Sequence, residues 1–213
     1  MARKVHVGIV LDRSGSMEDC RDDAIGAVNS YLRQVKDDKE LDARVSLTIF
    51  DSESIDLIRD RVAIAGCPPL SPGEYQPRAQ TPLLDAVGHG VTVLDKGKDT
   101  SERCILAIMT DGLENASREY TKETIKALLD RKQKEDGWLV LCLGAGHDAW
   151  QQARDMGLHA GNVAGFSKHR MSETMFALAG RGRRYAVAAE PASEAQSGGF
   201  TSEERARMSR DKN

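Results

Sequence analysis

Apolar residues along the chain fall into short continuous runs that alternate with stripes at helical spacing. Residues 5–12 have the pattern of a buried strand and end in a carboxylate, and apolar positions then recur at helical spacing over 24–35. A second apolar run, 44–50, is followed after a short turn by a third, 55–64, in which charged residues alternate with apolar ones. Strands joined by so short a turn must be antiparallel, and the mixed pattern indicates an edge strand.

The same alternation continues through most of the remaining chain. Thr81 and Pro82 are expected to open a helix that reaches residue 94, with Thr81 as its N-cap and proline in the first helical position. Further strands are predicted at 103–110, 138–143 and 162–166, and helices at 121–136, 149–156 and 167–185. This order predicts an α/β fold with a mostly parallel central sheet, one antiparallel edge strand and helices on both faces.

The regular pattern stops at about residue 188. The residues beyond it include Pro191, the pair Gly198-Gly199 and many serine, glutamate and arginine residues. Such a composition is typical of a mobile segment. We therefore predict one domain over 1–187 and a flexible C-terminal tail over 188–213.

Composition and charge restrict the possible functions. Of 213 residues, 40% are apolar, which is enough for a core, and 30 lysines and arginines against 33 acidic residues give a net charge of -3. A general basic field for nucleic acid or anionic lipid is therefore excluded. The first residues have neither an apolar h-region nor a small-residue cleavage site, so we expect no Sec-type signal peptide, and no apolar run has membrane-spanning length. The four cysteines have neither CxxC nor zinc spacing, which favours reduced thiols and a cytoplasmic location.

Oxygen-bearing side chains follow two of the predicted strands. Asp12, Ser14 and Ser16 come directly after the first strand at alternate positions, and a glycine between the serines lets the chain curl. Asp111 follows the fourth strand, and Thr81 begins a helix that returns to the same edge of the sheet. In open α/β sheets, ligands bind beyond the carboxyl ends of the strands, where the strand order reverses. The five side chains are therefore expected to meet at one point.

This set of donors indicates the kind of ion and the kind of ligand it would take. Carboxylate and hydroxyl oxygens without cysteine or histidine favour Mg²⁺, with Mn²⁺ or Ca²⁺ as alternatives. An octahedral ion has six ligands, so five protein groups leave at least one position open. Two carboxylates only neutralise a divalent ion, which therefore stays electrophilic. We expect such a site to accept an aspartate or glutamate from a partner.

Three segments of the sequence resemble the metal-ion-dependent adhesion site of von Willebrand factor A domains. They are Asp12-Arg13-Ser14-Gly15-Ser16, Thr81-Pro82-Leu83 and Thr110-Asp111-Gly112. The resemblance implies a Rossmann-like, three-layer fold with strand order 3-2-1-4-5-6. It also implies that Asp12, Ser14, Ser16, Thr81 and Asp111 hold the ion, and that a partner protein supplies an acidic side chain. The chain is similar to intracellular bacterial or phage members of the family, so the partner is expected to be an ATPase or another component of a multi-protein complex.

The loop over 66–80 precedes Thr81, and we predict that Arg13, Tyr75 and Gln76 form a rim that contacts the partner. Two other functions are possible. A haloacid-dehalogenase-like hydrolase or phosphotransferase would need a second aspartate two residues after Asp12, where this chain has Ser14. A purely structural protein would use the metal only to stiffen the fold. The sequence favours a binding protein over an enzyme.

Overall fold

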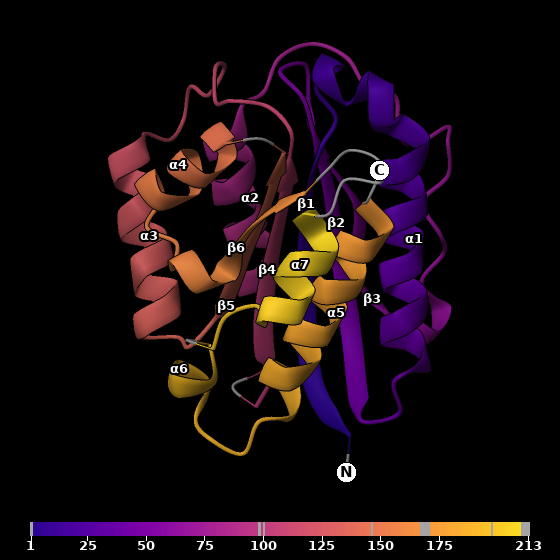
Figure 1. The fold of residues 1–213 in the computed structure, drawn as a ribbon, viewed down its shortest axis with the longest axis vertical. Helices are drawn as coiled ribbons and strands as arrows, with labels where there is room; N and C mark the ends of the chain where they lie inside the picture. Colours follow the sequence, from indigo (N-terminus) through magenta and orange to yellow (C-terminus); the bar gives the residue numbers. More distant parts are fainter. Residues whose placement is uncertain are drawn as a thin grey trace.

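The protein is built on a central sheet of six strands, shown in Figure 1. The computed structural model describes residues 2–97, 99, 101–145, 147–166, 171–196 and 198–209. Its strands are β1 (Arg3–Asp12), β2 (Leu41–Phe50), β3 (Ile55–Ala63), β4 (Arg103–Thr110), β5 (Leu139–Ala145) and β6 (Val163–Phe166). They lie in the order β3-β2-β1-β4-β5-β6. Neighbouring strands are parallel except for the β2–β3 pair, which is antiparallel.

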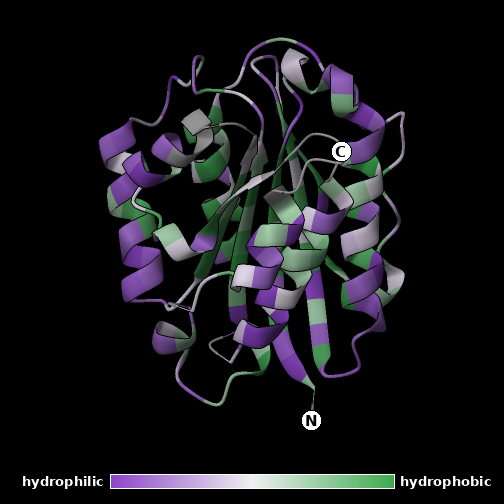
Figure 2. Ribbon diagram, viewed as in Figure 1, coloured by the Kyte–Doolittle hydropathy of each residue, from purple (hydrophilic) through white to green (hydrophobic). Residues whose placement is uncertain are grey.

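Helices cover both faces of this sheet. On one face lie α1 (Arg21–Asp37) and α5 (Met171–Val187), and on the other lie α2 (Leu83–Asp95), α3 (Lys122–Lys134) and α4 (His147–Asp155). Short 3-10 turns occur at Gly15–Cys20, Ile64–Gly66 and Ala160–Asn162. Figure 2 shows the apolar strands enclosed between helices with polar outer faces. The predicted α/β fold, its mostly parallel sheet and its antiparallel edge strand are therefore confirmed.

Strand β1 lies in the middle of the sheet and is buried on both faces. Val7 and Ile9 pack in the core beneath α1 and α5, whereas Val10 packs in the core beneath α2. Successive side chains of a strand point to opposite faces, so a central parallel strand is apolar along its whole length. This explains why the run over 5–12 was readable from sequence. Among the described residues, no helix is both long and apolar enough to cross a bilayer.

Helix α2 and strand β1 each carry a glycine where a side chain of the other element packs closely. A Cβ atom on Gly8 of β1 would come within 2.9 Å of the Leu94 side chain, and a Cβ on Gly90 of α2 would lie 2.6 Å from Val10 Cγ2. Glycine permits such close approach because it has no side chain. The helix begins at Leu83 with Pro82 as N-cap, so the prediction that Thr81 caps it was wrong. Thr81 instead lies in the preceding loop, next to the carboxyl end of β1.

The segment after α5, which we predicted to be a flexible tail, contains regular structure. It contains the helices α6 (Ala192–Ala195) and α7 (Ser202–Ser209), and the side chains of Phe200 and Met208 are buried. Arg184 of α5 holds Glu204 of α7 through two hydrogen bonds of 2.6 and 2.8 Å. With Ala195, only three apolar residues of this polar segment are buried, which leaves no helical stripe to detect. Residues 167–170, where α5 was predicted to start, and 210–213, at the end of the predicted tail, lie outside the described part.

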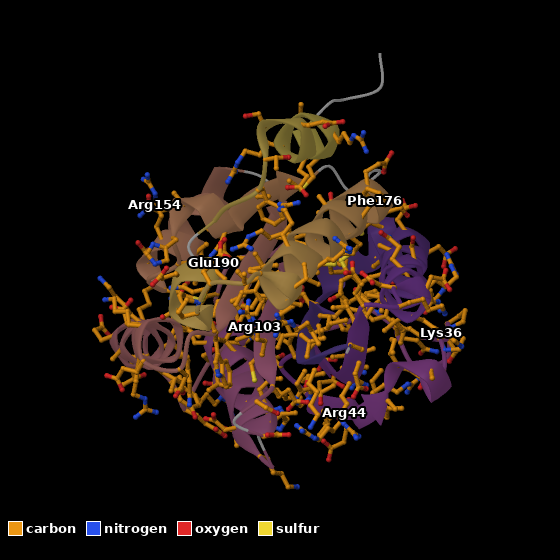
Figure 3. The ribbon with its side chains drawn as sticks, turned by 90° about the horizontal axis from the view of Figure 1, so that it is seen from below. Lys36, Arg44, Arg103, Arg154, Phe176 and Glu190 are labelled. Carbon is orange, nitrogen blue, oxygen red and sulfur yellow. The ribbon has the colours of Figure 1, made fainter. Side chains whose placement is uncertain are left out.

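Buried and half-buried arginines attach this segment to the rest of the protein. Arg103, at the start of β4, donates hydrogen bonds to the carbonyl oxygens of Ala188 at 3.1 Å and Glu190 at 2.7 Å, and Figure 3 labels Arg103 and Glu190. Arg181 of α5 is 2% exposed and donates to the carbonyl of Gln196 at 2.8 Å. Main-chain carbonyls are available on any segment, so sequence patterns do not reveal these contacts.

Candidate metal centre

The turn after β1 is shaped by the carboxylate of Asp12. Asp12 lies at the end of β1 and is fully buried, and its Oδ1 accepts a hydrogen bond of 2.7 Å from the backbone N–H of Ser14. Aspartate commonly accepts from the backbone two residues later and so bends the chain. The N–H of Gly15 then donates to the carbonyl of Ala79 at 3.1 Å, which joins the turn to the loop before α2.

Hydroxyl groups link this turn to the end of β4. Ser14 Oγ lies 3.1 Å from Ser16 Oγ, and Ser16 Oγ donates to Asp111 Oδ1 at 2.5 Å. Thr110, the last residue of β4, donates through Oγ1 to Asp12 Oδ2 at 2.5 Å. The carboxyl ends of two neighbouring parallel strands thus bring both carboxylates into one network.

Thr81 reaches the same place from the α2 side. A Cβ atom on Gly112 would lie 2.8 Å from Thr81 Oγ1 and 3.6 Å from Asp12 Oδ2, so the Thr81 hydroxyl and the Asp12 carboxylate flank the same glycine. Asn115 fixes the backbone of Thr81 by two hydrogen bonds. The Thr81 N–H donates to Asn115 Oδ1 at 2.9 Å, and the Asn115 N–H donates to the Thr81 carbonyl at 3.1 Å. The structure therefore brings all five predicted ligand residues together.

The electrostatics of Asp12 fit a site for a cation. The hydrogen-bond donors to its carboxylate are the Ser14 amide and the Thr110 hydroxyl, both neutral. Burial, and to a lesser extent the charge of Asp111, raise the pKa of Asp12 to about 6 even though these hydrogen bonds lower it. A nearby divalent cation would stabilise the ionised carboxylate. The donor set contains only hard oxygen ligands, so the residues present suit Mg²⁺, Mn²⁺ or Ca²⁺.

Two of the three predicted rim residues are buried, so the structure differs from the expected exposed rim. Tyr75 is fully buried and donates its hydroxyl to the carbonyl oxygen of Asp12 at 2.6 Å. Arg13 is 7% exposed and forms ion pairs with Asp51 at 2.7 Å and Asp56 at 2.9 Å. Both side chains therefore lie in the interior next to the Asp12 turn, where they stabilise its conformation. Gln76 is exposed, as predicted.

The ion pairs of Arg13 belong to a larger network beside the site. Asp51, at the end of β2, also accepts from Arg78 Nε at 3.0 Å and from the backbone N–H groups of Glu53 and Ser54. Burial raises the pKa of Asp51, but the hydrogen bonds from Arg78 and the two amides outweigh burial and leave the pKa lowered. Asp51 is thus ionised and holds Arg13 away from the carboxylates of Asp12 and Asp111.

Side chains from other elements hold the proline-rich loop that contains Tyr75. Arg59 of β3 forms a bidentate pair with Glu74, with distances of 2.7 and 3.2 Å, and this contact lowers the pKa of Glu74 to about 2. Asn29 of α1 hydrogen bonds with both the N–H and the carbonyl of Leu70. Arg21 donates to the Tyr75 carbonyl at 3.0 Å. These contacts hold the loop at Leu70, Glu74 and Tyr75.

Sequence reasoning missed the residues that orient the loop after β4. The carboxylate of Glu114 accepts a hydrogen bond from the N–H of Leu84 at 3.0 Å and so lies at the N-terminus of α2. Gln152 of α4 accepts from the Glu114 N–H at 2.6 Å and donates to the Gly112 carbonyl at 3.3 Å. With Asn115 they connect the Asp111 loop to two helices. Polar residues in a loop without periodicity gave no signal for these roles.

Comparisons with known proteins show the fold. No family model matches the chain, and no curated protein sequence matches it. The chain is similar to the solved von Willebrand factor type A structure from Catenulispora acidiphila, with a TM-score of 0.61 and 14% identity over 86% of this chain and 44% of that one. The chain thus spans less than half the length of that protein.

Two shorter solved structures match over almost their whole length. The von Willebrand factor domain of the type V pili tip protein Mfa5 from Porphyromonas gingivalis matches with a TM-score of 0.64 and 10% identity, over 90% of this chain and 99% of that one. The SpRpn10 VWA domain matches with a TM-score of 0.53 and 12% identity, over 80% of this chain and 94% of that one. The chain therefore has the Rossmann-like fold of von Willebrand factor A domains.

Proposed function

We propose that the protein is a metal-dependent interaction module that binds an acidic residue of a partner protein through a divalent cation. The observation that supports this most directly is the convergence of two carboxylates and three hydroxyls, from three separate segments, at the carboxyl end of β1 and β4. The fold is commonly one of protein-interaction modules. The proposed activity is binding, without turnover of a substrate.

Each residue of the site has a distinct role in this proposal. Asp12 and Asp111 supply the negative charge that holds Mg²⁺, with Mn²⁺ or Ca²⁺ as alternatives. Ser14, Ser16 and Thr81 contribute neutral oxygens, which orient the ion without reducing its affinity for a further anion. Bound there, the cation supplies an electrophilic point that a carboxylate can occupy. The partner is a protein with an exposed aspartate or glutamate, such as an ATPase or a component of a multi-protein complex.

Calorimetry combined with capture tests this proposal. Wild-type protein is titrated with Mg²⁺ and Mn²⁺, and immobilised protein is exposed to a cell lysate in Mg²⁺ or in EDTA. We expect Asp12→Ala to remain folded by circular dichroism but to lose metal binding by at least about 100-fold, together with every Mg²⁺-dependent partner. Asp42→Ala, an exposed position at the opposite end of the sheet, is the matched control and should behave as wild type.

Two outcomes would contradict the proposal. If Asp12→Ala captures the same proteins as wild type, an acidic partner residue does not bind through the metal. If purified wild-type protein hydrolyses p-nitrophenyl phosphate and Asp12→Ala does not, the haloacid-dehalogenase-like alternative replaces the binding function.

A further inference from the structure

A pocket of about 390 Å³ opens beside the candidate metal centre. It lies between the turn after β2, the outer side of α2 and the loop that precedes α3, and its lining includes Ser54, Asp85, His89, Thr92, Glu119 and Tyr120. We call it the α2 pocket. It shares its border with the metal centre, because Pro82, which follows Thr81, also lines it, as does Asp51, the ion-pair partner of Arg13.

Helix α2 presents one face to this pocket. Asp85, His89 and Thr92 are four and three residues apart, so they lie along one side of the helix. Between them, Gly88 allows the ring of Tyr120 to approach, because a Cβ on Gly88 would lie only 2.4 Å from Tyr120 Cε2. The pocket therefore has an aromatic wall next to a row of polar side chains.

The lining of the pocket is acidic. It contains the carboxylates of Asp51, Glu53, Asp85 and Glu119, whereas Arg118 is the only lysine or arginine among the lining residues. Arg78, outside the lining, forms ion pairs with Asp51 at 3.0 Å and Glu53 at 3.1 Å, so the excess of acidic groups lies with Asp85 and Glu119. Asp85 is 7% exposed, and the donors to its carboxylate are the backbone N–H groups of Arg118, Glu119 and Tyr120, at 2.8 to 3.0 Å. Neutral amides leave the negative charge of Asp85 in place, so the pocket attracts cations.

A buried nitrogen in the lining also lacks a partner. Nδ1 of His89 is inaccessible to solvent and has no hydrogen-bond partner among the described residues. Buried polar atoms are nearly always hydrogen bonded in folded proteins, so a turn of the imidazole that brings this nitrogen to a ligand in the pocket would remove a cost. The pocket thus offers carboxylate oxygens, an imidazole and an aromatic ring.

We infer that the α2 pocket receives a lysine or arginine side chain of the partner whose carboxylate reaches the metal centre. Carboxylates provide charge-assisted acceptors for an ammonium or guanidinium group, and the Tyr120 ring provides a surface for a cation–π contact. This inference rests on the proposed function for the identity of the partner, but the preference of the pocket for a basic side chain does not. The partner segment therefore combines an acidic and a basic residue.

The preference for a basic side chain can be measured without any metal or partner. The full chain, labelled with ¹⁵N, is titrated in EDTA with N-acetyl-arginine methylamide and with the citrulline analogue, which has the same shape and no charge. We expect the arginine compound to shift the amide signals of Ser54, Thr92 and Glu119 and to bind about five-fold more tightly than the citrulline compound.

Charge variants of exposed lining residues provide the second measurement. Glu53→Gln combined with Glu119→Gln is expected to weaken binding of the arginine compound about five-fold, because two of the attracting charges are removed. Glu135→Gln, an exposed change after α3, is the control and should leave binding unchanged. Equal binding of the two compounds, or no effect of the double variant, would overturn the inference.

A third measurement tests whether one peptide can occupy the metal centre and the α2 pocket together. Peptides that carry one glutamate and one arginine, separated by glycine linkers of increasing length, are compared in Mg²⁺ with their citrulline versions. At least one linker should give about five-fold tighter binding for the arginine peptide, and the absence of any such linker would overturn the inference. Failure of Mg²⁺ binding with the arginine response intact would refute the proposed function alone. Intact Mg²⁺ binding without an arginine response would refute the pocket alone.

Discussion

Two buried polar clusters lie on the same face of β1, at opposite ends, and they are built in different ways. In the His6 cluster, His6 Nε2 is 2.9 Å from Ser46 Oγ, and Arg61 donates to His6 Nδ1 at 3.0 Å and to Glu102 at 2.7 Å. In the Asp12 cluster, the buried carboxylate is met by hydroxyl and amide donors. The first cluster pairs a cation with an anion, and the second gathers carboxylates around neutral groups.

The two clusters differ in whether the charge of their buried titratable group is compensated within the protein. Burial and the charge of Arg61 lower the pKa of His6 to about 4, so the histidine is neutral in a cluster whose charges balance internally. Burial raises the pKa of Asp12 to about 6, so ionisation of this residue opposes folding until something else compensates it. The His6 cluster is complete by itself, whereas under the proposed function the Asp12 cluster is completed by a cation.

Removal of His6 gives the largest expected effect. His6→Ala leaves Ser46 and Arg61 without their buried partner and should lower the free energy of unfolding by about 4 kcal/mol, measured by urea denaturation. Metal binding measured by calorimetry should not change. The exposed His159→Ala is the control and should cost less than about 0.5 kcal/mol. A loss below about 1 kcal/mol for His6→Ala would mean that the cluster does not stabilise the fold.

Acid should act on the His6 cluster in a defined direction. The pKa of His6 is about 6.5 in the unfolded chain and about 4 in the folded protein, so its contribution is full above pH 6.5 and is lost as the pH falls towards 4. Relative to His6→Gln, the wild type should lose about 3 kcal/mol between pH 7 and pH 4. Asp12 titrates in both proteins, so its effect cancels. A constant difference in unfolding free energy would contradict this prediction.

The Asp12 cluster should respond with the opposite sign. The folded-state pKa of Asp12 is raised from 3.8 to about 6. The free energy of unfolding therefore falls as the pH rises through this interval. In EDTA at neutral pH, Asp12→Asn should therefore stabilise the protein by about 2 kcal/mol, while it abolishes Mg²⁺ binding. The gain should disappear near pH 4. Destabilisation at neutral pH would show that the ionised carboxylate is already compensated within the protein.

The smallest expected effect comes from crowding the Asp12 cluster. Gly112→Ala places a methyl group 2.8 Å from Thr81 Oγ1 and should weaken Mg²⁺ binding about ten-fold, or about 1.4 kcal/mol, by calorimetry. Gly66→Ala is the matched control, since a Cβ there meets no atom within 4 Å. Equal affinities of the two variants would indicate that Thr81 can move away without loss to the site.

The strands, and the proximity of the five candidate ligand residues, were predictable because their signals are local. A central strand such as β1 is apolar along its length, and Asp12, Ser14 and Ser16 follow it at fixed short spacing. Asp111 ends a second strand of the same kind, so the topology of the sheet was sufficient to bring it near Asp12. The fold was predicted almost completely for the same reason.

Residues that act through long-range contacts were not predictable. Tyr75 lies in a loop without periodicity, and nothing in its neighbours indicates that its hydroxyl reaches the Asp12 carbonyl. Arg13 was expected at the surface because arginine is usually exposed, but Asp51 and Asp56 balance its charge in the interior. Helix α7 packs through Glu204 and Met208, with Phe200 buried just before it, which is too few apolar residues to form a detectable stripe.

The glycine contact between α2 and β1 makes the candidate metal centre sensitive to substitutions far from the candidate metal-ligating residues. Gly90 is separated from Thr81 by more than two helical turns, yet a methyl group at Gly90 would press on Val10. We expect the added methyl group to push α2 away from β1 and to displace the loop before α2, which contains Thr81. Under the proposed function, substitutions at Gly8 or Gly90 would therefore weaken metal and partner binding in a protein that still folds, and binding assays alone would not distinguish them from substitutions of the candidate ligand residues.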